Sequence, residues 1–145
     1  MNILVAVDLS PASDIVVEAA RGVAELTRVS VFILHAVETE PGFTCPEKDP
    51  EAARDWVAKN FPLEQSRVQA LVDELMDDGF DAEGVLVCGS AVDATLKEAD
   101  SLDAGLIVVG THGHGAVYSA LIGSYSVGII RKSKLPVLVV PIRET

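Results

Sequence analysis

The sequence has few cysteines and no long apolar run, and nothing at its start resembles an export signal. Two of its 145 residues are cysteines, Cys45 and Cys88, and they form no CxxC motif. We therefore expect two free thiols. No apolar run approaches the roughly 20 residues of a membrane-spanning helix, so we expect no membrane insertion. The chain opens on an apolar strand pattern without a basic segment or a cleavage site, which predicts a cytoplasmic protein.

Basic residues are also scarce. Eleven Lys and Arg residues oppose 22 Asp and Glu residues, and the formal net charge is −11. Such a charge repels the phosphates of nucleic acids and the surface of anionic membranes, so nucleic acid is excluded as a partner. Two explanations of the acidity stay open, which are solubility and adaptation to a salty cytoplasm.

Short β-branched runs alternate with helical patterns along the whole chain. The expected strands are Ile3–Val7, Val29–Val37, Val85–Val87, Leu106–Val109 and Leu135–Val140. Continuously apolar strands are typical of a parallel sheet that helices cover on both faces. The pattern predicts a three-layer α/β/α fold with five parallel strands. No repeat or linker divides the chain, so we expect a single domain over residues 1–145.

Helix ends are marked by caps, prolines and glycines. Ser or Pro at a helix start and Gly just beyond its end are the expected signals. We expect helices from Ser10–Pro11 to about Thr27, between Glu51 and Lys59, from Pro62 to Gly79, and after a capping box formed by Ser90 and Asp93. The irregular stretch between residues 38 and 62 is long for a compact domain, which favours a lid or a partner surface.

The most informative segment is rich in glycine and lies between an apolar strand and the next helix. Gly110 and Gly113 follow the strand, and Gly123 and Ser124 open the helix. Glycines let successive backbone N–H groups converge on an anion, and a helix start adds unpaired N–H groups. The order GxxGxG from Gly110 is neither a Walker loop nor a dinucleotide motif. Phosphate is the natural ligand, and glycines that only make turns are the alternative.

The spacing of these four residues, G-x2-G-x9-G-S, resembles the ATP-binding signature of the universal stress protein family. The similarity extends to the opening strand and to the ends of the later strands, and it covers essentially the whole chain. It implies a doubly wound sheet of order 3-2-1-4-5 and a homodimer joined through Val137–Val140. Pairing that apolar edge strand would also remove an uncovered sheet edge.

The resemblance implies a nucleotide site at the carboxyl ends of the strands, where open parallel sheets bind ligands. The residues implied are Asp8, Leu9, Ser10, Ala36, Val37, Val109, Gly110, Gly113, His114, Gly123, Ser124, Tyr125 and Ser126. Asp8 is expected near the ribose or adenine, with Leu9 and Ser10 beside it in the site, and the backbone of Ala36 or Val37 is expected at the adenine edge. Val109 is expected to line the ribose, and the remaining residues to hold phosphates. The alternative for Asp8 is that it serves only as an N-terminal cap and does not contact the nucleotide.

Three positions depart from the family pattern. Tyr125 replaces a small aliphatic residue, and its side chain either crowds the phosphates or points away. His114 replaces an arginine, and because imidazole is mostly uncharged at neutral pH, triphosphate affinity is predicted to fall as pH rises. Gly128 costs about 1 kcal/mol against alanine in a helix, which implies either a packing reason or a loosened helix.

The expected ligand is ATP, with ADP and AMP as alternatives, and Mg²⁺ carried by the nucleotide. The first hypothesis is a nucleotide-dependent stress-response or signalling module that acts on an unknown signalling partner. The second is a slow ATPase or nucleotidyl transferase, but the loop offers His112 and His114 without an acidic cluster, so we assign no catalytic residue and no protein-held metal. The third is an interaction dimer that has lost nucleotide binding.

Overall fold

The sheet of this protein has five parallel strands in the order β3-β2-β1-β4-β5. The computed structural model describes residues 1–37, 39–40, 42, 44–111 and 122–142. The strands are β1 (Asn2–Ala6), β2 (Ser30–Ala36), β3 (Ala82–Val87), β4 (Ala104–Gly110) and β5 (Val137–Val140). The predicted parallel sheet and its strand order are therefore confirmed.

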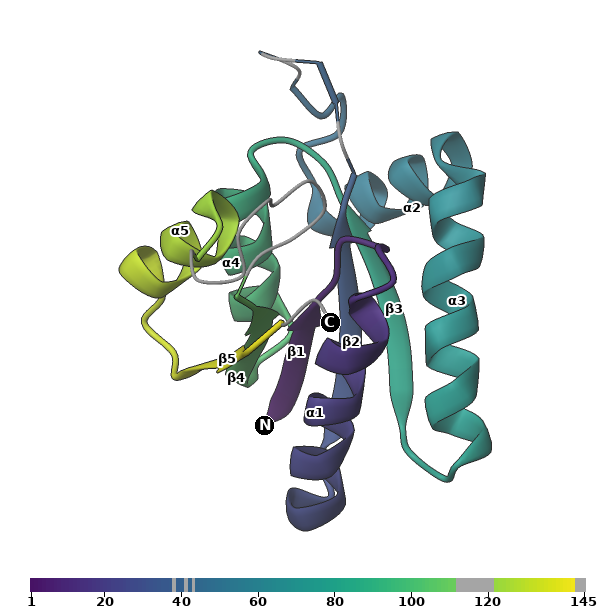
Figure 1. Ribbon diagram of the computed structural model, residues 1–145. Helices are drawn as coiled ribbons and strands as arrows, with labels where there is room; N and C mark the ends of the chain where they lie inside the picture. The colour runs from purple at the N-terminus through teal and green to yellow at the C-terminus, as the bar shows by residue number, and fades with distance from the viewer. Residues whose placement is uncertain (38, 41, 43, 112–121, 143–145) are drawn as a thin grey trace.

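Helices cover both faces of the sheet (Figure 1). They are α1 (Ser13–Thr27), α2 (Pro50–Asn60), α3 (Pro62–Asp77), α4 (Ala91–Ser101) and α5 (Ser124–Lys132). One core cluster joins the sheet to α1, α2 and α3, and a second joins it to α4 and α5. This is the predicted three-layer arrangement. No helix in the described ranges is long and apolar enough to cross a bilayer.

The central strand β1 shows why the strands are apolar at successive positions instead of alternating between apolar and polar residues. Ile3 and Val5 belong to the core beneath α1 and α3, whereas Leu4 and Ala6 belong to the core beneath α4 and α5. All four are buried. Since successive side chains of a strand point to opposite faces, a strand covered on both faces needs apolar residues at every position.

The helix boundaries agree with the predictions better than the capping bonds do. Helix α1 ends at Thr27 as expected but begins at Ser13, and no side chain caps it. Helix α4 follows Ser90, yet Ser90 makes no capping hydrogen bond, so the predicted capping box is wrong in its bonding. Gly79 follows α3 with φ 90°, a conformation that glycine adopts without strain.

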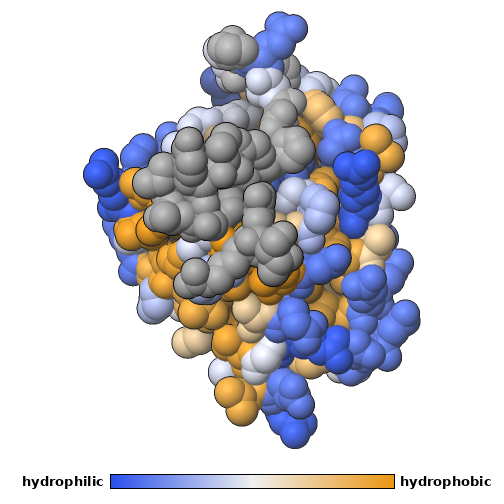
Figure 2. Space-filling view, viewed as in Figure 1, coloured by the Kyte–Doolittle hydropathy of each residue, from blue (hydrophilic) through white to orange (hydrophobic). Residues whose placement is uncertain are grey.

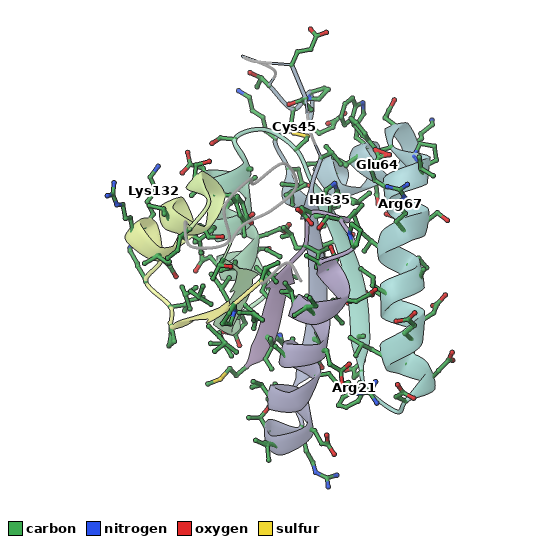
Figure 3. All side chains as sticks on the ribbon, in the orientation of Figure 1. Arg21, His35, Cys45, Glu64, Arg67 and Lys132 are labelled. Carbon is green, nitrogen blue, oxygen red and sulfur yellow. A yellow bond between two sulfur atoms is a disulfide. The ribbon has the colours of Figure 1, made fainter. Side chains whose placement is uncertain are left out.

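The prediction of two free thiols is wrong, because Cys45 and Cys88 form a disulfide. Cys45 precedes α2 and Cys88 follows β3, and their Cα atoms are 5.9 Å apart, within the range of disulfides. The connection from β2 to α2 returns over the end of β3, where Figure 3 shows Cys45 above the strands. A separation of 43 residues hides this proximity in the sequence. Disulfides are rare in reducing compartments, so this bond does not support the expected cytoplasmic location, which stays a prediction.

Candidate functional site

The candidate site lies at the carboxyl ends of β1 and β4, which point to the top of Figure 1. Strand β1 pairs with β2 on one side and with β4 on the other. The chain therefore leaves β1 toward β2 and later crosses to the opposite side of β1. Such a reversal of strand order opens a crevice at the carboxyl ends of the strands, where ligands of this fold class bind.

A tight turn follows β1. The Asp8 carboxylate accepts the Ser10 N–H at 2.9 Å and the Ser13 hydroxyl at 3.3 Å. Leu9 has φ 65°, a left-handed conformation that is uncommon for a leucine. Strained residues of this kind persist where the surrounding structure holds them, often at ligand sites. These bonds join the end of β1 to the start of α1 and fix the Asp8 carboxylate in the turn between them.

Ser10 has a buried hydroxyl without a hydrogen-bond partner. Only two buried side-chain oxygens in the described part of the chain lack a partner, and Ser10 Oγ is one of them. Leaving a buried polar group unsatisfied costs about 1–3 kcal/mol. A hydroxyl can both donate and accept, so a ligand with either kind of group can satisfy it.

The two ends of the glycine segment meet although the segment is long. The Gly123 N–H donates to the Thr111 carbonyl at 2.7 Å. Ser126 Oγ donates to the Gly110 carbonyl at 2.5 Å. These bonds hold the first turn of α5 against the end of β4. Gly113 and His114, which the sequence also assigns to the site, lie outside the described residues.

The start of α5 suits an anion. Gly123 is its N-cap residue, and in the structure no side chain caps the helix and no acidic residue lies in its first turn. The first backbone N–H groups of a helix lack partners within the helix and carry the positive end of its dipole. Ser124, the first helical residue, is exposed and adds a hydroxyl.

The Tyr125 side chain is directed toward α4. Its hydroxyl lies 2.6 Å from Thr95 Oγ1, and Thr95 donates its own proton to the Ala91 carbonyl, so Tyr125 donates to Thr95. Burial raises the pKa of Tyr125 to about 12. Of the two orientations left open by the sequence, the structure has the one in which the side chain points to a neighbouring helix.

Two predicted side chains are buried and already used. Ser126 is 3% exposed and its proton is bound to Gly110, whereas Val109 is 1% exposed and belongs to the core. These side chains position the β4–α5 connection. Gly128 has a packing reason, because a Cβ built there would lie 2.7 Å from Val92 Cγ2 on α4.

The end of β2 contributes a buried histidine and a strand backbone. His35 Nδ1 lies 2.9 Å from the Val7 carbonyl, and because a carbonyl only accepts, Nδ1 carries the proton. The Val37 N–H donates to the Val87 carbonyl at 2.9 Å, so that N–H belongs to the sheet. The sequence analysis did not predict this link between β2 and β1.

Comparison with known proteins gives a consistent result. The family model described as Universal stress protein family matches residues 1–141. A universal stress protein of Methanocaldococcus jannaschii is 25% identical over 151 residues, which span 96% of this chain and 93% of that protein. A universal stress protein from Archaeoglobus fulgidus, solved in complex with dAMP, is 25% identical with a TM-score of 0.71 and covers 97% of each chain. A universal stress protein solved in complex with cAMP is 26% identical with a TM-score of 0.69, covering 97% of this chain and 95% of that one.

Proposed function

The chain belongs to the universal stress protein family, and we propose that it binds an adenine nucleotide at the carboxyl ends of β1 and β4. The structures with cAMP and dAMP support adenine as the base. The observation that carries the proposal is the contact between Thr111 and Gly123, which brings the end of β4 and the start of α5 together. The N–H groups of the first turn of α5 then lie beside the end of β4, where one ligand could meet both segments.

The phosphates are proposed to lie at the start of α5. Ser124 supplies an exposed hydroxyl there, and the N–H groups of the first turn after Gly123 lack partners within the helix, with Gly110 opposite. The Gly123 N–H itself is bonded to the Thr111 carbonyl. Gly113 and His114 complete this half of the site in the proposal. Ser126 and Tyr125 act through their hydrogen bonds to Gly110 and Thr95, which keep the helix start in place.

The nucleoside is proposed to lie between the ends of β1 and β2. The turn of Asp8, Leu9 and Ser10 offers a carboxylate and the unpartnered Ser10 hydroxyl to the ribose. At the adenine edge the Val37 N–H is used by β3, so its carbonyl is the group that would accept the adenine amino group. Ala36 precedes it at the end of β2. Val109 supports the ribose from within the core.

We propose ATP as the ligand, with Mg²⁺ bound mainly by phosphate oxygens and water, as that ion prefers. Asp8 is close to its own turn and would reach such an ion through water. The whole chain, residues 1–145, then acts as one nucleotide-binding domain. Binding would stabilise the nucleotide-competent conformation, which a signalling partner recognises.

Titration of the purified protein with adenine nucleotides tests the proposal. Bound nucleotide is first released by denaturation and identified, and refolded, nucleotide-free protein is titrated with ATP, ADP, AMP and cAMP with Mg²⁺. We expect Gly123→Val to weaken ATP binding by at least about tenfold, or about 1.4 kcal/mol, because a branched side chain would obstruct the α5 start. Gly22→Ala is the control, since open space surrounds Gly22 in α1.

Four further results of this experiment distinguish the alternative functions and test the role of His114. Equal affinity in Gly123→Val and wild type would contradict the site, and no binding of any adenine nucleotide would leave an interaction protein. Phosphate release during the titration, lost in Ser124→Ala, would identify a slow ATPase. Repeating the titration at pH 6 and 8 tests the predicted loss of affinity at high pH that rests on His114.

We also propose a homodimer through β5. This strand pairs only with β4, at one end of the sheet. Val137, Leu138 and Val139 are partly exposed, and Figure 2 shows hydrophobic side chains gathered over this strand. An apolar edge strand of this kind favours pairing with a second copy. A molar mass of one chain in light scattering would contradict the dimer.

A further inference from the structure

A second cavity opens at the outer edge of β3, away from the proposed nucleotide site. This β3-edge cleft has a volume of about 330 Å³ and lies between α2, α4 and the end of β3. Its size is at the lower end for small-molecule sites. Aliphatic side chains line its floor, among them Val57, Leu86, Val87 and Ala94. None of the residues assigned to the nucleotide site lines it.

The cleft contains a buried carboxyl group with an unused oxygen. Glu98 on α4 is 5% exposed, and its Oε2 is the second of the two buried side-chain oxygens that lack a partner in the described part of the chain. Glu98 Oε1 lies 3.6 Å from Arg54 Nε on α2. Burial raises the pKa of Glu98, and the charges of Arg54 and Lys97 oppose that rise.

An ion pair with a purely structural role does not explain why Glu98 Oε2 lacks a hydrogen-bond partner. An ion pair that only joined α2 to α4 would be satisfied best by bonds to both oxygens, since an unpaired buried acceptor costs free energy. Glu98 is one of the residues that line the cavity, so a donor group bound there could approach this oxygen. An ionised carboxylate accepts hydrogen bonds only, so the missing partner is a donor, and an ammonium group is the strongest candidate.

The surrounding charges restrict the rest of the ligand. Among the described residues, three cationic side chains and two anionic ones line the cleft, namely Lys48, Arg54 and Lys97 with Glu47 and Glu98. A simple cation would meet this local excess of positive charge, although the chain as a whole carries −11. A ligand that carries a negative group next to its ammonium avoids this repulsion. The contact between Glu98 and Arg54 offers both signs of charge within one small region.

We propose that the β3-edge cleft binds a small zwitterion with an aliphatic body, of the aliphatic α-amino acid class. The ammonium group donates to Glu98 Oε2, the carboxylate lies toward Arg54 and Lys97, and the body packs on Val57 and Leu86. The disulfide between Cys45 and Cys88 lies at the rim and holds the segment before α2 in place. The nucleotide site plays no part in this inference.

Three ligands with closely similar bodies test the proposal. Leucine carries both charges, 3-methylbutylamine carries only the ammonium, and 4-methylpentanoate carries only the carboxylate. The full-length protein, labelled with ¹⁵N and free of nucleotide, is titrated with each ligand and followed by two-dimensional NMR. We expect leucine to shift the amide signals of Leu86 and Val87 and to bind at least about tenfold more tightly than either other ligand, because only leucine engages both charges.

Two variants on the same helix locate the effect. Glu98→Gln should weaken leucine binding at least about tenfold, because an amide oxygen replaces the charged acceptor. Asp100→Asn is the control, since it removes the same charge from an exposed position of α4 outside the cleft. If Glu98→Gln does not fold, Ala53→Phe fills the cleft from α2 and should also abolish the leucine shifts.

Several results would overturn the proposal. One is an absence of leucine-induced shifts at millimolar concentration, and another is equal leucine affinity in Glu98→Gln and wild type. Tight binding of 3-methylbutylamine or 4-methylpentanoate, equal to that of leucine, would show that one of the two charges has no role. Because nucleotide is left out of the titration, failure of the proposed ATP site would not affect any of these outcomes.

Discussion

The carboxyl ends of β1 and β4 and the β3-edge cleft each contain a buried oxygen without a hydrogen-bond partner, but the two regions are built in different ways. At the carboxyl ends of β1 and β4, backbone hydrogen bonds and hydroxyl groups hold the chain, and the unused oxygen is the neutral hydroxyl of Ser10. At the β3-edge cleft, a disulfide and an ion pair hold the chain, and the unused oxygen belongs to the Glu98 carboxyl group.

The difference suggests which ligands each region can accept. Backbone N–H groups at a helix start suit phosphates without any charged side chain, so an acidic chain can still bind a nucleotide there. A buried carboxyl group, in contrast, costs more to leave unpaired than a hydroxyl, and it selects for a donor of positive charge. The following four predictions test how independent the two regions are.

Reduction of the disulfide should have the largest effect and should separate the regions most clearly. The bond closes a loop of 43 residues, and such bonds contribute about 2–4 kcal/mol to stability. We expect dithiothreitol to lower the free energy of unfolding by that amount, measured by urea denaturation, while ATP affinity is unchanged. The Cys45→Ser variant is the control that dithiothreitol should not affect. If both proteins respond alike, the disulfide makes no contribution.

Gly128→Ala should disturb the β1–β4 end alone. A Cβ at this position would lie 2.7 Å from Val92, and overpacking costs about 1–3 kcal/mol, which exceeds the gain of about 1 kcal/mol in helix propensity. We expect a net loss of stability in urea denaturation. In a Val92→Ala background the same substitution should stabilise the protein. Gly22→Ala, in open space in α1, should also stabilise it. A loss of stability in all three would point to a backbone requirement instead.

Glu98→Gln should change how stability depends on pH. Because burial raises the pKa of Glu98 in the folded protein, the folded state holds this proton more tightly than the unfolded state. The stability of the wild type relative to Glu98→Gln is therefore greatest below the unfolded pKa of about 4.5 and falls as pH rises through the folded pKa.

Urea denaturation of both proteins between pH 4 and 7 measures that difference. We expect a smaller effect than for Gly128→Ala, since glutamine has nearly the same shape as glutamate. The Asp100→Asn variant, exposed on the same helix, should follow the wild-type profile. A gain in the stability of wild type relative to Glu98→Gln as pH rises would contradict the assigned direction.

Ser10→Ala should have the smallest effect on stability. Its hydroxyl has no partner, so its removal breaks no hydrogen bond and should lower the free energy of unfolding by less than about 0.5 kcal/mol, if at all. ATP affinity should fall severalfold if the ribose uses this hydroxyl. Ser133→Ala is the matched comparison, because Ser133 Oγ donates to the Leu135 carbonyl and accepts its N–H, both at 2.9 Å, and should cost about 1 kcal/mol. Equal losses in the two variants would mean that Ser10 is bonded in solution.

The β1–β4 end could largely be predicted because its signals are local. Gly110 follows an apolar strand and Gly123 opens a helix, and each of these features is contained in a few neighbouring residues. What could not be predicted there is how side chains are used. Ser126 and Val109 were expected to face the ligand, but Ser126 donates to Gly110 and Val109 is buried in the core.

The sequence by itself determined the fold class, the strand order through the family resemblance, and the place of the glycine segment, since apolar runs, prolines and glycines act over short distances. Only the tertiary structure decided the partners of residues far apart in the chain. Cys45 reaches Cys88 and Arg54 reaches Glu98 because the connection after β2 and helix α2 pack at the edge of β3. No local pattern encodes such a meeting, which depends on how the helices and strands pack against one another.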